Sequence, residues 1–240
     1  MKAQPLGVFV SLYGISLKKQ YSLSEFPLVK VYSQDYPRGD AKKWRDARSK
    51  SKTPITSAEL EKVVIGVVRG LYALHRVFGL VHRDIKTDNI FITDDGGAVL
   101  ADFENCIKAN CAEEIEKEKK QGVNLDYTGS IYYRPPDLDQ VFGFEWDIFS
   151  LGLSLHYLLA GYLPYDPDEP AKTKTDLEDL MKQGIKEVKT KYIEGDVSVI
   201  IEIMKMCLKK KEERPNIQEI AQILMIDVSS IEKLSKSEEK

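Results

Sequence analysis

The chain has 240 residues, of which 42% are hydrophobic and 30% are charged. A chain of this length and composition can bury a substantial core, so intrinsic disorder is not expected. Its 35 Lys and Arg residues nearly balance its 38 Asp and Glu residues, for a net charge of −3. This balance excludes the basic field typical of nucleic-acid-binding domains, and no apolar run approaches the ~20 residues needed to cross a bilayer. We therefore expect no nucleic-acid partner and no membrane insertion.

The chain contains three cysteines, Cys106, Cys111 and Cys207. Their number and spacing provide neither a disulfide framework nor the C-x-x-C pair that is typical of zinc sites. We expect reduced thiols and, because reduced thiols are typical of that compartment, an intracellular, cytoplasmic protein.

The first part of the chain predicts a small β-structure followed by a hinge. Within residues 1–32, apolar and polar residues alternate near Val8–Tyr13 and over Pro27–Tyr32, which favours two strands. Residues 33–40 contain Pro and Gly and indicate a hinge between two lobes. At its end, Asp40 is suited to cap the helix that follows, because its carboxylate can accept hydrogen bonds from unpaired backbone N–H groups.

The middle of the chain predicts a helix, a hairpin and a buried helix. Apolar residues recur at helical spacing over Ser57–His75, and Gly66 and Gly70 within this helix indicate close packing. Residues 89–101 form two apolar segments around the sequence DDGG, which is typical of a β-hairpin. The almost wholly apolar residues 146–159 predict a buried helix.

The remaining segments predict further helices and two solvated stretches. Amphipathic patterns favour helices over residues 196–208 and 216–224, the second of which follows Pro215. We interpret the mixed-charge run 113–120 and the charged tail 227–240 as solvated faces, because such runs usually face water.

The strongest chemical signal lies around the hairpin. The segment His82–Asn89 reads HRDIKTDN and precedes the hairpin, and Asp102 follows it directly. Phosphoryl transfer from a nucleotide requires a carboxylate that receives the proton of the attacking hydroxyl, together with oxygen ligands for Mg²⁺. Asp84, Asn89 and Asp102 supply these groups. Lys86 adds a positive charge that can neutralise the transferred phosphoryl group.

These residues resemble motifs of the eukaryotic-type protein kinase family, whose catalytic loop reads H-R-D-x-x-x-x-N and whose next motif reads D-F-G, here DFE at 102–104. Three more segments are similar to family motifs. Residues 129–137 (GSIYYRPPD) resemble the end of the activation segment, 146–152 (WDIFSLG) the start of a buried helix, and 213–215 (ERP) the site of a structural arginine. The resemblance covers residues 8–226.

The resemblance implies an α+β, protein-kinase-like fold. A mainly α-helical large lobe would occupy residues 41–226, and a truncated β small lobe residues 1–32, with the hinge at 33–40 and the charged tail at 227–240. The implied reaction is transfer of the γ-phosphoryl group of ATP, with Mg²⁺, to Ser or Thr hydroxyls of a protein substrate. The lysine two residues after Asp84 is typical of Ser/Thr kinases.

The same resemblance implies roles for the residues of the site. Asp84 is the catalytic base, and Lys86 and Arg83 are further catalytic residues of its loop. Asn89 and Asp102 are the implied Mg²⁺ ligands and, with Lys86, bind the nucleotide.

Four more residues receive structural roles: Ser130, Asp137, Asp147 and Arg214. Ser130 is expected to bond Asp84 and Lys86. Asp147, together with Arg83, is expected to tie the catalytic loop to the buried helix, and Asp137 to pair with Arg214.

The activation segment has an unusual composition. Between Asp102 and Thr128 the sequence contains no Ser or Thr, whereas in the family a phosphate on this segment pairs with the arginine that corresponds to Arg83. Two interpretations stay open: either one acidic residue of the segment pairs permanently with Arg83, or the acidic run is a solvated insertion. The candidate acids are Glu113, Glu114, Glu116 and Glu118.

Two family features do not occur in the sequence. It has no G-x-G-x-x-G motif, and Lys30 fits a strand that leads into the hinge better than the lysine that holds the nucleotide phosphates. Two interpretations therefore remain. The chain is a Ser/Thr kinase whose small lobe is completed by an upstream segment or a partner, or it is a pseudokinase that serves as a protein-binding scaffold. The presence of Asp84, Asn89 and Asp102 together favours the kinase.

Overall fold

The computed structural model describes residues 38–122, 129–136, 142–165 and 192–237, together with residues 179, 182, 184, 185 and 190. The two strands predicted within residues 1–32, most of the hinge, and Asp137 lie outside the described residues.

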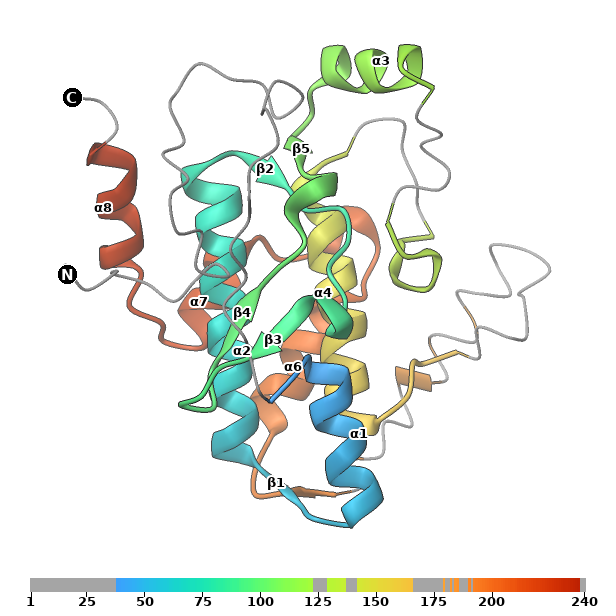
Figure 1. Cartoon of the computed structure of the whole chain (residues 1–240), viewed down its shortest axis with the longest axis vertical. Coiled ribbons are helices and arrows are strands. Elements are labelled where there is room, and N and C mark those ends of the chain that lie inside the picture. The colour runs from blue at the N-terminus through green and yellow to red at the C-terminus, as the bar shows by residue number, and fades with distance from the viewer. Residues whose placement is uncertain are drawn as a thin grey trace.

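The described residues are mainly helical (Figure 1). The helices are α1 (Ala41–Ser51), α2 (Ser57–Tyr72), α3 (Ala112–Lys120), α4 (Phe144–Ala160), α6 (Ser198–Cys207), α7 (Ile217–Ile223) and α8 (Ser229–Ser237). The strands are β1 (Ile55–Thr56), β2 (Leu80–Val81), β3 (Ile90–Ile92), β4 (Ala98–Leu100), β5 (Ile107–Lys108) and β6 (Ile193–Glu194). They form three pairs: β1 with β6 in parallel, and β2 with β5 and β3 with β4 antiparallel.

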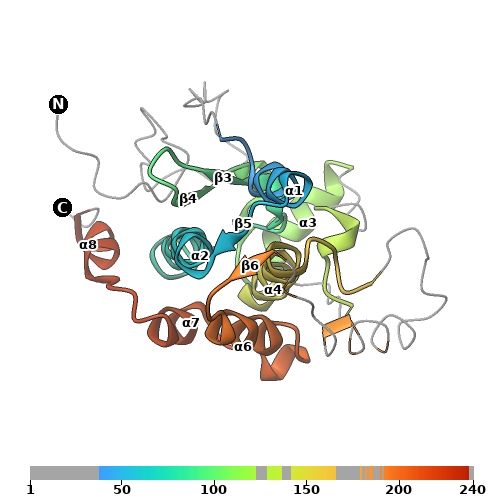
Figure 2. The same ribbon diagram turned by 90° about the horizontal axis from the view of Figure 1, so that it is seen from below.

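Helices α2 and α4 form the centre of the fold. Figure 2 shows them in a middle layer, with α1 and the β3–β4 hairpin on one side and α6 and α7 on the other. Nearly every residue of α4 is buried, as its apolar sequence predicts. The predicted hairpin is also confirmed, with Ile90 opposite Leu100 and Ile92 opposite Ala98.

Helix α2 packs directly against the hairpin. It begins with a capping box in which Thr56 and Glu59 satisfy each other's backbone N–H groups, and it buries a continuous apolar face. A Cβ atom placed on Gly66 would lie 2.2 Å from the carbonyl oxygen of Ala98 in β4. The close packing predicted at Gly66 is therefore present, and it fixes the position of the hairpin.

Helix α1 is fixed at both its start and its middle. The Asp40 side chain accepts a hydrogen bond from the Lys43 N–H at 2.8 Å, so the predicted N-cap is confirmed. Arg45 is fully buried, and its guanidinium donates to the carbonyl oxygens of Leu158 at 2.7 Å and Leu159 at 3.3 Å. These carbonyls belong to the last turn of α4, where carbonyl groups have no N–H donor within the helix.

The two charged segments, expected as solvated faces, each form a helix that also buries an apolar side chain. The acidic run forms α3, in which Ile115 is buried against residues of β2, β5 and α4, and the tail forms α8, in which Ile231 is fully buried. The Tyr72 hydroxyl donates to Glu232 of α8 at 2.6 Å. The charged side chains Glu113, Glu116, Lys117, Lys119 and Lys120 of α3 are exposed, as expected of a solvated face, while Ile115 packs this helix onto the core.

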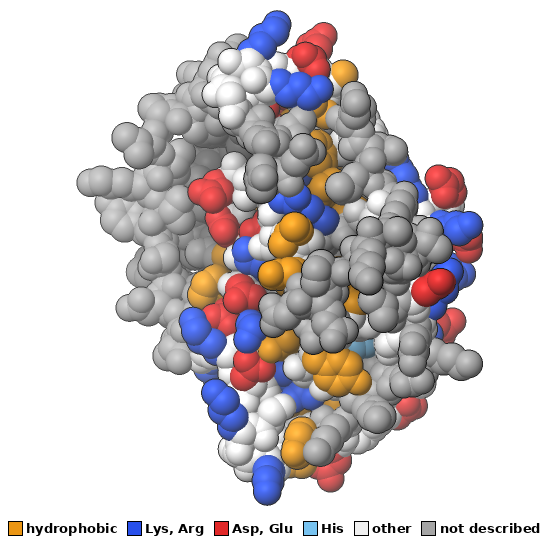
Figure 3. All heavy atoms as spheres, turned by 90° about the vertical axis from the view of Figure 1, so that its right-hand side faces the viewer, with side chains coloured by type: hydrophobic (Ala, Val, Ile, Leu, Met, Phe, Trp, Pro, Cys, Tyr) orange, Lys and Arg blue, Asp and Glu red, His pale blue; other side chains and the backbone are white. Residues whose placement is uncertain are grey.

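The surface carries charges of both signs. In Figure 3, basic and acidic side chains alternate around exposed hydrophobic ones, as the balanced composition predicts. In the part of the chain that the structure describes, no helix combines the length and the hydropathy needed to span a membrane.

The three cysteines are free thiols. Cys106 and Cys207 are buried, and burial raises the pKa of Cys207 to about 12. This thiol therefore stays protonated at neutral pH, as expected for a packing residue.

Candidate active site

The loop between β2 and β3 is held by one buried carboxylate. Asp147 of α4 is fully buried, and it accepts hydrogen bonds from the backbone N–H groups of His82 at 2.7 Å and Arg83 at 2.9 Å. The resemblance predicted that Asp147 and Arg83 tie the loop to the buried helix, and in the structure the backbone N–H of Arg83 makes this contact. The loop residues are therefore fixed to the central helix.

His75 is a second partner of Asp147 that the sequence analysis did not assign to the site. It lies in the π-helical turn η2 (Ala73–Val77), and its Nε2 atom is 2.8 Å from the Asp147 carboxylate. Its ring packs on Phe144, with centroids 4.6 Å apart. The available signal was a polar residue at a position that the helical period places on the buried face.

Four of the expected site residues meet at Asp84. The Lys86 ammonium donates to Asp84 at 2.8 Å and to the Ser130 hydroxyl at 2.7 Å. The Ser130 N–H donates to the second carboxylate oxygen at 2.8 Å. The Asn89 amide donates to the Asp84 carboxylate and to its backbone carbonyl, both at 2.9 Å. The Asp84 carboxylate is thus held in one orientation from three sides.

This environment keeps Asp84 ionised. Burial, the largest effect, opposes the charge, since Asp84 is only 5% exposed. The hydrogen bonds from Lys86 and Ser130 together outweigh it, so the pKa of Asp84 lies below its ordinary value. At neutral pH the site therefore presents a carboxylate that can accept a proton.

Gly129 brings the activation segment into contact with the catalytic loop. Its φ is +70°, and a Cβ atom there would lie 2.1 Å from the carbonyl oxygen of Arg83. Only glycine allows this close approach without strain. The contact places Ser130, the next residue, against Asp84.

Asp102 lies at the same end of the hairpin as Asn89. The Ala101 N–H donates to the Asn89 carbonyl at 2.9 Å, and Asp102 is exposed at the start of η4 (Phe103–Asn105). Because Asn89 bonds Asp84 through its amide nitrogen, its side-chain oxygen is directed away from Asp84. An amide oxygen and an exposed carboxylate at one end of a hairpin are hard oxygen donors that suit Mg²⁺.

His82 supports the base of the loop as a neutral imidazole. Its Nε2 atom is 3.0 Å from the Ala101 carbonyl, which only accepts, and its Nδ1 atom accepts from the Asp84 N–H at 3.3 Å. This pattern requires the tautomer with the proton on Nε2. Burial lowers the pKa of His82, which favours the same neutral form.

We expect this histidine to make stability fall as the pH drops below about 6.5, its ordinary pKa. Since the folded-state pKa is lowered, the unfolded chain binds a proton first, so the stabilisation is complete above pH 6.5 and is lost as the pH falls. His82→Gln should reduce the slope of unfolding free energy against pH by up to about 1.4 kcal/mol per pH unit. The measurement is chemical denaturation at a series of pH values. Equal slopes in the variant and the wild type would refute the assignment. His156, whose pKa burial also lowers, contributes equally to both proteins.

The Arg83 side chain points to the activation segment rather than to Asp84. Its guanidinium makes two hydrogen bonds to the Glu118 carboxylate of α3, at 2.9 and 2.7 Å, and its Nε donates to the Asn105 carbonyl at 2.5 Å. Of the two interpretations left open by the sequence, the structure shows the pairing of Arg83 with an acidic residue, which is Glu118.

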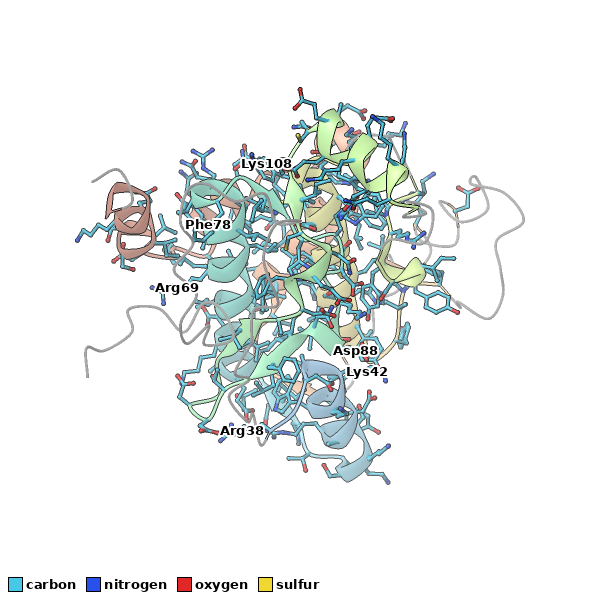
Figure 4. The ribbon with its side chains drawn as sticks, turned by 45° about the horizontal axis from the view of Figure 1, so that its top comes forward. Arg38, Lys42, Arg69, Phe78, Asp88 and Lys108 are labelled. Atoms are coloured by element: carbon cyan, nitrogen blue, oxygen red, sulfur yellow. The ribbon has the colours of Figure 1, made fainter. Side chains whose placement is uncertain are left out.

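Arg214, another expected residue, and Asp88 of the catalytic loop lie at the edges of the site. The Arg214 guanidinium donates to the carbonyl oxygens of Lys209 at 3.0 Å and Glu145 at 3.3 Å, while its expected partner, Asp137, lies outside the described residues. Asp88 is exposed near Lys42, where the turn η3 (Thr87–Asn89) meets α1 (Figure 4).

Comparisons with a family model and with curated proteins point to the same family. Residues 32–225 match the family described as protein kinase domain. Serine/threonine-protein kinase PAK 5 of Rattus norvegicus is 30% identical over 138 residues, which cover 57% of this chain and 18% of the relative. Serine/threonine-protein kinase PAK 4 of Homo sapiens is 31% identical over 136 residues, covering 56% and 22%. The dual specificity mitogen-activated protein kinase kinase 1 of Dictyostelium discoideum is 29% identical over 131 residues, covering 54% and 19%.

The chain thus spans about a fifth of the length of these curated relatives. The family match covers most of the chain, and the mainly helical α+β fold agrees with it. The chain belongs to the protein kinase family.

Proposed function

We propose that the chain transfers the γ-phosphoryl group of ATP to a Ser or Thr hydroxyl of a protein substrate. The observation that carries this proposal is the Asp84 carboxylate, which is ionised and held by Lys86, Ser130 and Asn89. General base catalysis requires such a group to be oriented before the substrate arrives.

Each residue of the site has a distinct part in this reaction. Asp84 accepts the proton of the attacking hydroxyl. Lys86, bonded to both Asp84 and Ser130, places a positive charge where charge develops on the transferred group. Asn89 and Asp102 are the residues that would hold Mg²⁺, which neutralises the phosphate oxygens when it is bound.

The surface beside Asp84 supports a polypeptide substrate. Ser130 contacts Asp84, and the next two residues begin the short helix η6 (Ile131–Tyr133). Ile131 is 65% exposed and Tyr132 is 43% exposed. Apolar side chains that face solvent, beside the place where the substrate hydroxyl would meet Asp84, provide a surface on which an extended polypeptide can bind.

We propose that nucleotide binding also requires groups that the described residues do not provide. In the family, a glycine-rich loop and a lysine hold the nucleotide phosphates, and this sequence contains no G-x-G-x-x-G motif. We propose that an upstream segment or a partner chain completes the small lobe.

The test is transfer of labelled phosphate from ATP with Mg²⁺ to a generic basic protein. Asp84→Asn should lower the transfer rate by about 10²–10⁴-fold, because the base is lost while the size of the side chain is kept. Asp88→Asn is the matched control, since Asp88 is an exposed carboxylate of the same loop. It should leave transfer within a few-fold.

Two results would count against this proposal. Equal transfer by the wild type and Asp84→Asn would remove Asp84 from the reaction. No transfer by a folded wild type, with a candidate upstream segment or partner chain added, would favour the alternative of a pseudokinase that binds a protein partner.

A further inference from the structure

Helix α3 is joined to the catalytic loop by a partly buried ion pair. Both terminal nitrogens of Arg83 donate to the two carboxylate oxygens of Glu118, at 2.9 and 2.7 Å. Arg83 follows His82 directly, and its own backbone N–H is bonded to Asp147. One residue therefore connects α3 to the loop that carries Asp84.

The burial of this pair makes it energetically important. The Arg83 side chain is 2% exposed and that of Glu118 is 24% exposed. Bidentate pairing satisfies the geometry of the guanidinium, whereas a buried arginine without its carboxylate would keep an uncompensated charge. The Arg83 backbone is also held in the left-handed region, with φ of +65°, so the surrounding contacts must stabilise this conformation.

Two further contacts fix α3 independently of Glu118. Ile115 is buried against Val81, Ile107 and Trp146. The Glu114 carboxylate accepts a hydrogen bond from the Lys108 N–H of β5 at 3.0 Å. Because β5 pairs with β2, which leads into the catalytic loop, α3 is packed on the same structural unit that it joins through Arg83. The position of Glu118 is therefore set by the fold.

The sequence leaves Glu118 as a permanent source of negative charge at this place. Between Asp102 and Thr128 there is no Ser or Thr to receive a phosphate. A carboxylate does not depend on modification, and its two oxygens match the guanidinium as those of a phosphate would.

We propose that Glu118 is a positioning residue that, through Arg83, holds the catalytic loop and the activation segment in the arrangement seen here without phosphorylation. The ordering role rests on the ion pair alone, and its consequence for catalysis rests on the proposed function. The ion pair requires both the negative charge of Glu118 and a side chain long enough to contact the Arg83 guanidinium.

Amide hydrogen exchange of the nucleotide-free, phosphatase-treated protein tests the ordering role. Glu118→Gln should speed exchange by at least about tenfold in peptides that cover residues 82–86 and 105–120. The matched control is Glu116→Gln, because Glu116 lies on the same helix, is 58% exposed and pairs at 2.9 Å with Lys119, three residues further along this helix. The control should exchange as the wild type does.

Rescue and kinetics separate positioning from general stabilisation. Glu118→Asp keeps the charge on a shorter side chain and should recover part of the protection that Glu118→Gln loses. In the transfer assay, Glu118→Gln should lower kcat by about tenfold and leave the KM for ATP nearly unchanged, since the ion pair does not contact the proposed nucleotide ligands.

The outcomes distinguish failure of this inference from failure of the proposed function. Unchanged exchange in Glu118→Gln would overturn the positioning role, whatever the transfer rate. Protection in the wild type that depends on prior phosphorylation would also overturn it. Faster exchange in Glu118→Gln, combined with no transfer by any variant, would support the ion pair's ordering role and would reject the kinase activity instead.

Discussion

Replacing Asp147 by Asn is expected to destabilise the fold by about 3–5 kcal/mol and to release the catalytic loop. One carboxylate oxygen accepts from the His82 N–H and lies 2.8 Å from His75, and the other accepts from the Arg83 N–H. In the variant one of these oxygens becomes an NH₂ group, which faces a donor. A buried N–H is then left without a partner in a site that water does not reach.

The free energy of unfolding from chemical denaturation measures this effect. Glu145→Gln is the matched control on the same helix, because Glu145 makes an ion pair with Lys211 at 3.0 Å in which both side chains are 29% exposed. Such a pair should contribute less than about 1 kcal/mol. A loss in Asp147→Asn no larger than that of the control would show that the loop is not held by Asp147.

Replacing Gly66 by Ala is expected to destabilise the protein by about 2–4 kcal/mol, although alanine is the better helix former. The gain in helix propensity is about 1 kcal/mol. Against it, the added Cβ would lie 2.2 Å from the carbonyl oxygen and 2.8 Å from the nitrogen of Ala98. These are backbone atoms of β4 that cannot rotate away, so helix and hairpin must separate. Asn89 and Asp102, at the open end of that hairpin, should move with it.

Denaturation and phosphate transfer together measure this change. The control is Glu61→Ala, an exposed position of the same helix, where the substitution should change stability by less than about 0.5 kcal/mol. If Gly66→Ala were as stable as the wild type, helix propensity would have outweighed the contact, and the tight packing of α2 on β4 would be wrong.

The positions of the site follow from local sequence. The hairpin around DDGG is set by turn chemistry and by apolar segments of period two, and it places Asn89 and Asp102 at one end by geometry alone. The capped start of α1 at Asp40 and the buried face of α2 depend on neighbouring residues in the same way. The resemblance to the kinase family likewise relies on short segments, among them His82–Asn89 and residues 102–104 on either side of this hairpin.

The tertiary structure decided which long-range partners are used. Four glutamates were equivalent in sequence as partners of Arg83, and the packing of Ile115 turned α3 so that Glu118 reaches the arginine. His75 reads as one more member of a helical face until α4 places Asp147 beside it.

The charged tail illustrates the same limit, because its pattern does not show that Ile231 finds a buried position beside Tyr72 and η2. Periodicity and motif spacing determine what a segment can form and what chemistry it can offer. Which charged residues form ion pairs depends on how helices far apart in the sequence pack. An ion pair or a buried contact requires a fixed distance between two side chains, and only the assembled core supplies it.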